Sequence, residues 1–327
     1  MSSRHSFYLR LRLLYLWCNQ TNLYTADKKI AVFSIFDRDT ILHLRIPFSY
    51  FLLPVFIFGV SQASAIYVFR TVIVFVALHL FIYPGSNSYN SYMDNDTGSI
   101  GGLKNPPPAT KRLYYASIIV DIAGLLICAL SGWQNVVVMV GYIGFSKAYS
   151  WHGIRMKKRT YSGWASVMFF QGGYTYMLAN MAATNNVALS WFTNKNVECM
   201  LIASLIIGGS YPLTQIYQHD EDSRRGDFTI SYRLGITGTF IFTSVLFSAG
   251  AIVALHYFAT YYGINEFLVF LVCALPLLIY FSWWFYRTAK DKGFASYANA
   301  MLMNKISSTC MIICFIAILI LNHPALK

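Results

Sequence analysis

Charge is scarce in this sequence, and negative charge is the scarcest. Of 327 residues, 12% are charged, and 13 are acidic against 25 Lys and Arg. A soluble domain normally carries about 25% charged residues. This chain instead is 56% hydrophobic, with a mean hydropathy of +0.48. The composition excludes an ordinary soluble domain and predicts a membrane protein.

Several common chemical motifs are also missing. The six cysteines form no Cys-x-x-Cys pair and have no histidine at metal-ligand spacing, which argues against a zinc site or a disulfide framework. No phosphate-binding loop of the Gly-x-x-x-x-Gly-Lys type occurs, and no soluble catalytic domain is visible. The chemistry of this chain therefore has to lie within or beside its apolar segments.

Long apolar runs are what the sequence has in abundance. We predict an all-α, polytopic membrane protein with nine transmembrane helices around a central cavity. The predicted spans are 42–62, 65–84, 113–131, 135–149, 163–182, 197–213, 236–258, 264–286 and 304–322. Residues 1–41 are interpreted as a basic arm on the cytoplasmic membrane surface, since no cleavage site follows their short apolar stretch. Residues 42–327 form the predicted nine-helix domain.

Lysine and arginine are distributed unevenly between the two sides of these spans. With the N-terminus in the cytoplasm, only Arg70, Lys195 and Lys327 of the 25 cations fall on the opposite side. This pattern follows the positive-inside rule. It predicts an integral protein of the cell inner membrane, with its C-terminus on the non-cytoplasmic side. It also accounts for the net charge of +12, so no nucleic-acid partner is expected.

Two of the breaks between spans carry a cluster of acids beside an amide. The clusters are Asn90, Asp94 and Asp96 after the second span, and Gln218, Asp220 and Asp222 after the sixth. In each cluster the amide precedes an acid by four residues, which places both on one face if the segment is helical. Both clusters follow even-numbered spans, so both are predicted on the cytoplasmic side. Acids close to hydrocarbon are costly and indicate a function.

Carboxylate and amide oxygens suit Mg²⁺, which is normally shared with the phosphate oxygens of a substrate. We therefore predict that the ends of the second and sixth helices meet and hold Mg²⁺ over a diphosphate-bearing lipid. All six clustered residues are predicted metal ligands, and Asp94 and Asp222 are predicted to be essential for catalysis. The alternative is a pair of solvated, acidic loop ends.

These motifs resemble those of the UbiA-type intramembrane prenyltransferases. The family signature Asn-x-x-x-Asp-x-x-x-Asp is similar in its first half to Asn-Ser-Tyr-Met-Asp at 90–94. The family's basic-proline loop resembles Leu-Lys-Asn-Pro-Pro-Pro-Ala-Thr at 103–110, and its Tyr-Ser stretch resembles Tyr149 and Ser150. A segment that typically begins Gly-Lys-Arg-Thr and ends Arg-Leu-Gly resembles residues 226–235. The resemblance covers roughly residues 42–322.

The sequence departs from the family pattern at three positions. The third acid of the first signature falls at Gly98, with Asp96 two residues earlier. In the second signature Gln218 fills the first Asp position. Asn105 stands where an arginine usually precedes proline. The chain therefore resembles a divergent member of the family.

The resemblance implies an enzyme that uses Mg²⁺ to transfer a prenyl group from an allylic prenyl diphosphate to an aromatic or quinone-precursor acceptor, with release of pyrophosphate. Lys104, Arg155 and Lys157 are candidates for binding the diphosphate oxygens. Tyr149 is a candidate catalytic residue, because the face of its ring attracts a cation. The lipid bilayer is the remaining partner, since the long prenyl substrate enters from it.

Two other functions stay open on the sequence. A membrane terpene cyclase of the same superfamily would let the allylic cation attack its own double bonds, and the altered acid spacing is compatible with it. An ion-coupled transporter would carry acids or broken helices near the middle of the membrane. Asp121, early in the third predicted span, is the main candidate for such a site. The other acids gather mainly at one face, which favours an enzyme.

Overall fold

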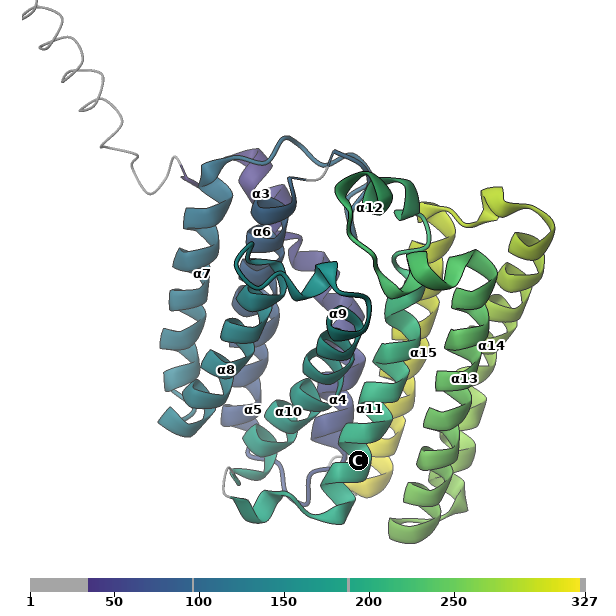
Figure 1. Ribbon diagram of the computed structural model, residues 1–327. Helices are drawn as coiled ribbons and strands as arrows, with labels where there is room; N and C mark the ends of the chain where they lie inside the picture. The colour runs from purple at the N-terminus through teal and green to yellow at the C-terminus, as the bar shows by residue number, and fades with distance from the viewer. Residues whose placement is uncertain (1–34, 96, 187–188, 324–327) are drawn as a thin grey trace, which may run out of the picture.

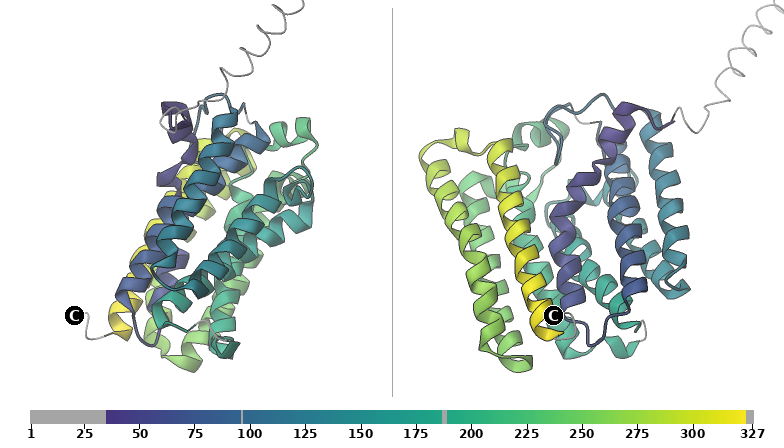
Figure 2. Two further views of the ribbon diagram at one scale, coloured as in Figure 1. Left: turned by 90° about the vertical axis from the view of Figure 1, so that its left-hand side faces the viewer. Right: turned by 180° about the vertical axis from the view of Figure 1, so that it is seen from behind.

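The computed structural model describes residues 35–95, 97–186 and 189–323. This described part consists of helices and loops, with one isolated bridge between Ile100 and Leu103 and no strand. Figures 1 and 2 show long helices side by side in one bundle, with the short helix α12 at one end. The predicted all-α membrane architecture is confirmed. Most of the predicted N-terminal arm, residues 1–34, lies outside the described residues.

Several helical elements follow one another directly, because a 3-10 or π turn interrupts the α pattern without ending the helix. The elements are α3 (Arg38–Leu44), η1 (Ile46–Leu52), α4 (Leu53–Ser61), α5 (Val68–Val76), η2 (Ala77–Ile82), α6 (Tyr83–Asp94), α7 (Lys111–Ala129), α8 (Trp133–Ser150), η3 (Met156–Lys158), α9 (Thr160–Val167), η4 (Met168–Tyr174), α10 (Thr175–Thr184), η5 (Leu189–Trp191), α11 (Asn194–Leu213), α12 (His219–Arg225), α13 (Ile230–Tyr261), α14 (Ile264–Lys290), η6 (Lys292–Phe294) and α15 (Tyr297–Asn322). The second long helix, for example, joins α5, η2 and α6.

This second long helix continues ten residues beyond its predicted end at residue 84. Pro84 lies in the first turn of α6, immediately after the π turn η2. Proline lacks the N–H that a helix interior needs, but it is tolerated at the start of a helical segment. The helix therefore runs on to Asp94. Asn90 and Asp94 lie one turn apart near its end, as their four-residue spacing predicts.

Seven of the helices in the described ranges are long and apolar enough to cross a membrane. The α8 and α9–α10 segments are not among them, so the number of nine spans stays a prediction. In α10 the bundle satisfies the polar side chain of Asn180. This amide donates to the backbone oxygen of Gly59 and accepts a hydrogen bond from Trp191, both at 2.8 Å. A helix whose polar groups are paired by its neighbours tolerates such residues at membrane depth.

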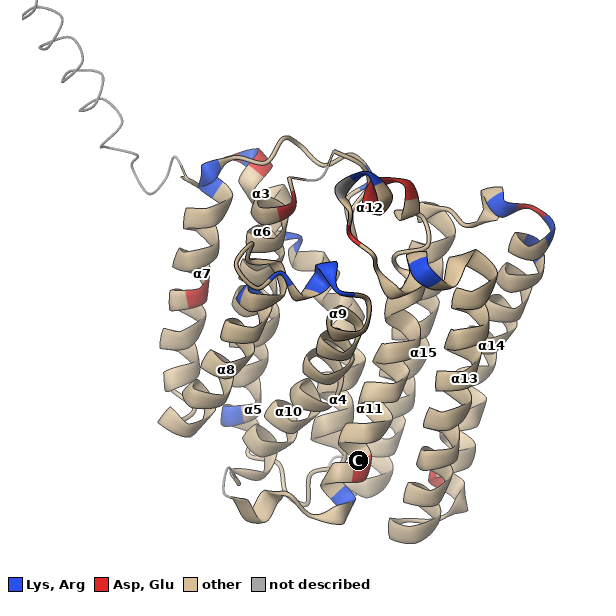
Figure 3. Cartoon of the chain, in the orientation of Figure 1, with Lys and Arg blue, Asp and Glu red and all other residues tan. Residues whose placement is uncertain are grey.

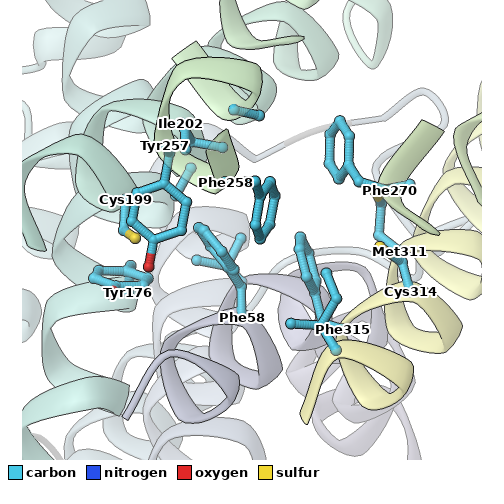
Figure 4. Packing of buried hydrophobic residues seen from close by; sticks show 14 of the residues in the cluster. Phe58, Tyr176, Cys199, Ile202, Tyr257, Phe258, Phe270, Met311, Cys314 and Phe315 are labelled. Carbon is cyan, nitrogen blue, oxygen red and sulfur yellow. The ribbon is translucent and has the colours of Figure 1, made fainter. Parts of the chain in front are cut away.

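A tightly packed apolar core closes the end of the bundle away from α12. Figure 4 shows aromatic and aliphatic side chains from α4, α10, α11 and α13 to α15 meeting there. The rings of Phe58 and Phe315 stack with centroids 4.6 Å apart. Beside them Tyr257 donates a hydrogen bond to Gln62 at 2.8 Å. This core holds the helices together at one end, and the polar cavity residues lie toward the other end.

Charged residues are also divided between the two ends of the bundle. Figure 3 shows most Lys and Arg at the end that carries α12. The first turns of α5 and α11, which contain Arg70 and Lys195, lie at the other end, as does the end of α15 (Figure 1). This division agrees with the charge pattern of the sequence. The assignment of the α12 end to the cytoplasm stays a prediction.

Candidate active site

A cavity of about 300 Å³ lies among the helices toward the α12 end. Its polar lining comprises residues from both predicted clusters and from the segments between them: Arg45, Asn90, Asp94, Tyr149, Lys157, Gln218, Glu221, Asp222 and Asp227. The end of α6 and the segment from the end of α11 to α12, which follow the second and sixth predicted spans, therefore line one space. Because these segments are far apart in sequence, their convergence is produced by the tertiary fold.

Asn90 and Asp94 reach the cavity from α6. The amide nitrogen of Asn90 donates to the hydroxyl of Ser150 on α8 at 2.8 Å, so the amide oxygen is not used in this bond. The side chain of Asp94 is 5% exposed, and its Oδ1 lies 2.5 Å from Nζ of Lys157. A buried carboxylate needs such a compensating charge. Asp96, the third predicted ligand of this cluster, lies outside the described residues.

The helix α12 is tied directly to the loop that follows α6. The amide nitrogen of Gln218 donates to the backbone oxygen of Ser99 at 3.0 Å. The carboxylate of Glu221 accepts from the backbone N–H groups of Thr97 and Gly98, both at 3.2 Å. These three hydrogen bonds join the two clusters, which are more than a hundred residues apart in the chain.

Glu221 also packs against the glycine at position 98, where the family signature would place its third acid. A Cβ atom at Gly98 would lie 2.5 Å from Oε2 of Glu221. A side chain at this position would therefore require the Glu221 carboxylate to move. Glu221, which lies between Asp220 and Asp222, thus places an acid beside the position where the first cluster lacks one. Glu221 lines the cavity and was not predicted as a site residue.

Asp227 is a second acid that was not predicted. A turn with φ of 67° at Gly226 folds the chain back, and the Asp227 N–H donates to the carbonyl of Asp222 at 2.9 Å. The Asp227 carboxylate is 3% exposed and lies 3.1 Å from Arg155 and 3.8 Å from Lys157. One signal in the sequence could have identified Asp227 as a site residue: it stands at a position where the family segment typically has lysine.

Asp222 faces the cavity, whereas three other predicted site residues, Lys104, Arg155 and Asp220, do not line it. Asp222 accepts a hydrogen bond from the hydroxyl of Thr229 at 3.1 Å. Asp220 is exposed, because residues two apart on a helix point in different directions. Lys104 is also exposed, in the loop between α6 and α7. Of the three predicted diphosphate-binding residues, Lys157 lines the cavity and Arg155 reaches it through Asp227.

Arg45 is an unpredicted cation in the cavity wall. It joins α3 to η1 with a left-handed φ of 47°, a conformation that is uncommon for residues other than glycine. Its guanidinium donates to the backbone oxygens of Gly101 at 2.9 Å and Asn87 at 3.1 Å. These hydrogen bonds stabilise the left-handed backbone at Arg45 and direct its side chain toward the cavity. Nothing in the local sequence distinguishes it from the neighbouring cations.

Tyr149, the predicted catalytic tyrosine of the Tyr-Ser stretch, lines the cavity from α8; its catalytic role stays a prediction. Its hydroxyl shares a hydrogen bond with the hydroxyl of Tyr211 on α11. Tyr211 in turn accepts a hydrogen bond from the amide nitrogen of Gln215 at 2.9 Å. Two tyrosines from different helices are therefore fixed relative to each other beside the acids.

Asp121 belongs to an ion pair outside the cavity lining. Its carboxylate lies 2.7 Å from Nζ of Lys147 on α8, and both side chains are largely buried. The same ammonium lies 4.4 Å from the centre of the Tyr89 ring. This acid inside α7 is thus neutralised by a cation from the neighbouring helix α8, which is a structural arrangement.

The donor atoms around the cavity fit Mg²⁺ that is shared with a substrate. Within the described ranges, no three His, Cys, Asp or Glu side chains converge as a metal site by themselves. Mg²⁺ usually binds one or two carboxylates and completes its shell with water and phosphate oxygens. Oxygen donors approach from α6 and from α12. In addition, Oδ1 of Asp227 is buried with no hydrogen-bond partner among the described residues.

The family and the fold can be compared with those of known proteins. A model of the UbiA prenyltransferase family matches residues 51–306. No curated protein matches the chain. A UbiA homolog from Archaeoglobus fulgidus bound to DMAPP and Mg²⁺ has a TM-score of 0.63 at 15% identity, covering 86% of this chain and 99% of that one. The homolog bound to GPP and Mg²⁺ has a TM-score of 0.62 at 17% identity, with the same coverage. Digeranylgeranylglyceryl phosphate synthase has a TM-score of 0.55 at 17% identity, covering 86% and 97%.

Proposed function

Because this chain belongs to the UbiA prenyltransferase family, whose general chemistry is prenyl transfer within a membrane, we propose that it is a Mg²⁺-dependent enzyme. It transfers a prenyl group from an allylic diphosphate to an aromatic or quinone-precursor acceptor and releases pyrophosphate. The observation that carries this proposal is the meeting of Asn90 and Asp94 with Gln218, Glu221 and Asp222 around one cavity. Two structures of similar fold hold DMAPP or GPP together with Mg²⁺, which supports this substrate class.

In this proposal the metal ligands come from the two helix ends. Asn90 and Asp94 bind from α6, and Gln218 and Asp222 bind from the α12 side. Glu221 and Asp227 complete the set of acids. Asp96 is retained as a ligand because of its position in the sequence motif. Asp220 is exposed and binds at the outer edge of the site. When bound, Mg²⁺ would neutralise the charge of the diphosphate and so make pyrophosphate a better leaving group.

The cations of the site are placed to hold the diphosphate oxygens. Nζ of Lys157 lies 2.5 Å from Asp94 and 3.8 Å from Asp227, so it reaches an anion bound between these acids. Arg155 contacts the same Asp227 oxygen, Oδ2, as Lys157 and offers a second cationic contact. Arg45 is the further cation in the wall, and Lys104 binds from the exposed loop.

Transfer then requires that a short-lived cation be kept away from water. The bond between the first prenyl carbon and oxygen breaks, and its electron pair leaves with pyrophosphate. The rings of Tyr149 and Tyr211 attract the allylic cation. The acceptor ring forms the new carbon–carbon bond and loses a proton to a pyrophosphate oxygen. Neither His152 nor His219 lines the cavity, so no histidine among the described residues is assigned as the base.

The proposal is tested by measuring pyrophosphate release from purified protein in lipid nanodiscs. We expect release that requires both Mg²⁺ and an aromatic acceptor and that stops when EDTA is added. Asp94→Ala and Asp222→Ala should each lower turnover about 100-fold or more, because each removes charge stabilisation at the breaking bond. Glu266→Ala, at the far end of α14, is the control for loss of an acid.

Two results would decide against this proposal. Full turnover in either Asp variant, or undiminished turnover under chelation, would show that the acids do not hold a required metal. Pyrophosphate release without an acceptor, accompanied by a cyclic hydrocarbon, would identify a cyclase instead.

A further inference from the structure

One lysine of the candidate active site contacts acids from two separate segments. Nζ of Lys157 lies 2.5 Å from Oδ1 of Asp94 and 3.8 Å from Oδ2 of Asp227. The lysine side chain is 12% exposed, and those of the two acids are 5% and 3% exposed. Asp94 ends α6, Lys157 lies in the short helix η3, and Asp227 follows α12. A single buried ammonium therefore links three segments that are far apart in the chain.

The ammonium contacts an acid that is predicted to hold the metal. Lys157 lies against the Asp94 carboxylate, from which an oxygen ligand for Mg²⁺ is expected. A buried carboxylate is compensated by one close cation, and two cations beside the same oxygen repel each other. The ion pair therefore weakens the attraction of Asp94 for a metal. Metal binding at Asp94 requires that the ammonium move away.

The charge balance around the cavity supports the same competition. The charged lining consists of four acids and two cations: Asp94, Glu221, Asp222, Asp227, Arg45 and Lys157. Arg155 contacts Asp227 from outside the lining, so the acids exceed the cations by one charge. An excess of one negative charge attracts a metal cation weakly and gives a diphosphate no net attraction. Removal of the Lys157 charge doubles this excess and favours the metal.

Asp227 offers Lys157 a position to which it can move. The other oxygen of Asp227, Oδ1, is buried and accepts no hydrogen bond within the described ranges. The carboxylate is held in place, because Arg155 contacts its Oδ2 at 3.1 Å and the Asp227 N–H donates to the carbonyl of Asp222 at 2.9 Å. A lysine ammonium has three donors on a flexible stem, so it can contact Asp227 and a substrate oxygen together. Asp227 stands where the family segment typically has lysine, so this position is a feature of this chain.

We propose that Lys157 makes the binding of Mg²⁺ depend on the binding of the diphosphate. Before the diphosphate binds, the ammonium neutralises Asp94 and keeps the affinity for the metal low. When the diphosphate binds, the ammonium moves toward Asp227 and the phosphate oxygens, and Asp94 then accepts the metal. By linkage, the metal raises the affinity for the diphosphate by the same factor. The inference rests on the proposed function and deepens it, because it makes Lys157 a positioning residue that couples two ligands.

The test measures two affinities of the full chain in lipid nanodiscs, with and without the charge of Lys157. The first is the affinity for Mn²⁺ alone, a probe that binds oxygen ligands as Mg²⁺ does, titrated by the paramagnetic resonance signal of the free ion. The second is the affinity for geranyl diphosphate at saturating free Mg²⁺, measured by calorimetry. In Lys157→Gln we expect Mn²⁺ to bind about tenfold more tightly and geranyl diphosphate about tenfold more weakly, as is usual for coupled sites.

The opposite signs of these two changes distinguish coupling from a structural role. A structural role would weaken both ligands, because the site would lose its shape. Lys157→Met keeps the aliphatic stem and should show the same two changes, so it serves if the glutamine variant does not fold. Lys158→Gln is the matched control, because it removes the charge of the next residue, which is exposed. It should keep both affinities within about twofold of the unmodified protein, since solvent and salt screen an exposed charge.

The inference fails in two cases. Unchanged or weaker Mn²⁺ binding in a folded Lys157 variant would show that the ammonium does not compete with the metal. Tighter binding of both ligands would show that Lys157 only blocks the site. Either result leaves the proposed function intact if turnover still requires Mg²⁺ and an acceptor. If the unmodified protein bound no geranyl diphosphate at saturating Mg²⁺, the proposed function and this inference would both be wrong.

Discussion

At the scale of single residues, the acids of the site differ in their surroundings. Asp94 and Asp227 are nearly fully buried and share Lys157, whereas Asp220, two residues before Asp222, is exposed. A buried acid that loses its charge leaves its partner cation uncompensated. An exposed acid keeps water as a substitute partner. Burial therefore indicates that Asp227, which lies outside the sequence motif, is more sensitive to substitution than Asp220, which lies within it.

This ranking predicts that Asp227→Asn is more harmful than Asp220→Asn. The amide at 227 removes the charge that holds Arg155 and Lys157, so we expect turnover to fall by about 10- to 100-fold, as when groups around a metal site are replaced. Asp220→Asn should cause a clearly smaller loss. Pyrophosphate release at saturating substrate measures both effects. A larger loss at 220 than at 227 would show that the sequence motif, not burial, identifies the ligands.

At the scale of helices, a buried ion pair joins α7 to α8. Asp121 and Lys147 form an ion pair at 2.7 Å, with side chains 8% and 21% exposed. Asp121 was identified in the sequence as an acid at membrane depth, but its partner lies on the next helix, 26 positions later. Sequence spacing cannot identify such a pair, because the relative rotation of two helices is set by their packing.

We expect Asp121→Ala to lower the free energy of unfolding by about 3–5 kcal/mol, because it leaves the Lys147 ammonium buried without its partner. The double variant Asp121→Leu with Lys147→Met, which replaces the pair by apolar side chains, should recover most of this loss. Denaturant unfolding in detergent micelles measures both values. Equal stability of Asp121→Ala and the unmodified protein would show that the pair contributes nothing.

At the scale of the whole molecule, the two ends of the bundle have different tasks. Aromatic packing closes one end (Figure 4), and the acids, the cavity and most cations gather toward the other (Figure 3). On the positive-inside rule we propose that the cation-rich end lies in the cytoplasm. A diphosphate substrate would then meet the site from the cytoplasmic side, while its chain lies among the helices.

This orientation predicts the labelling of two single cysteines in a background without native cysteines. Asp291→Cys lies in the connection between α14 and α15, and Ser190→Cys lies in η5 before α11. In intact cells, a membrane-impermeant maleimide should label the cysteine at 190 from outside, because it lies at the end with few cations. The cysteine at 291 should react only after the membrane is permeabilised. The reverse pattern would invert the proposed topology.

The sequence alone determined the membrane character, the helical class, the family and the positions of both acid clusters. These properties depend on composition and on spacing within one segment. The four-residue spacing of Asn90 and Asp94, or of Gln218 and Asp222, suffices to place an amide and an acid on one face. Tertiary structure decided that Glu221 covers Gly98, that Asp227 folds into the site and that Arg45 lines it. Each of these depends on a turn or a loop that brings distant segments together, and such long-range approach leaves no periodic pattern in the chain.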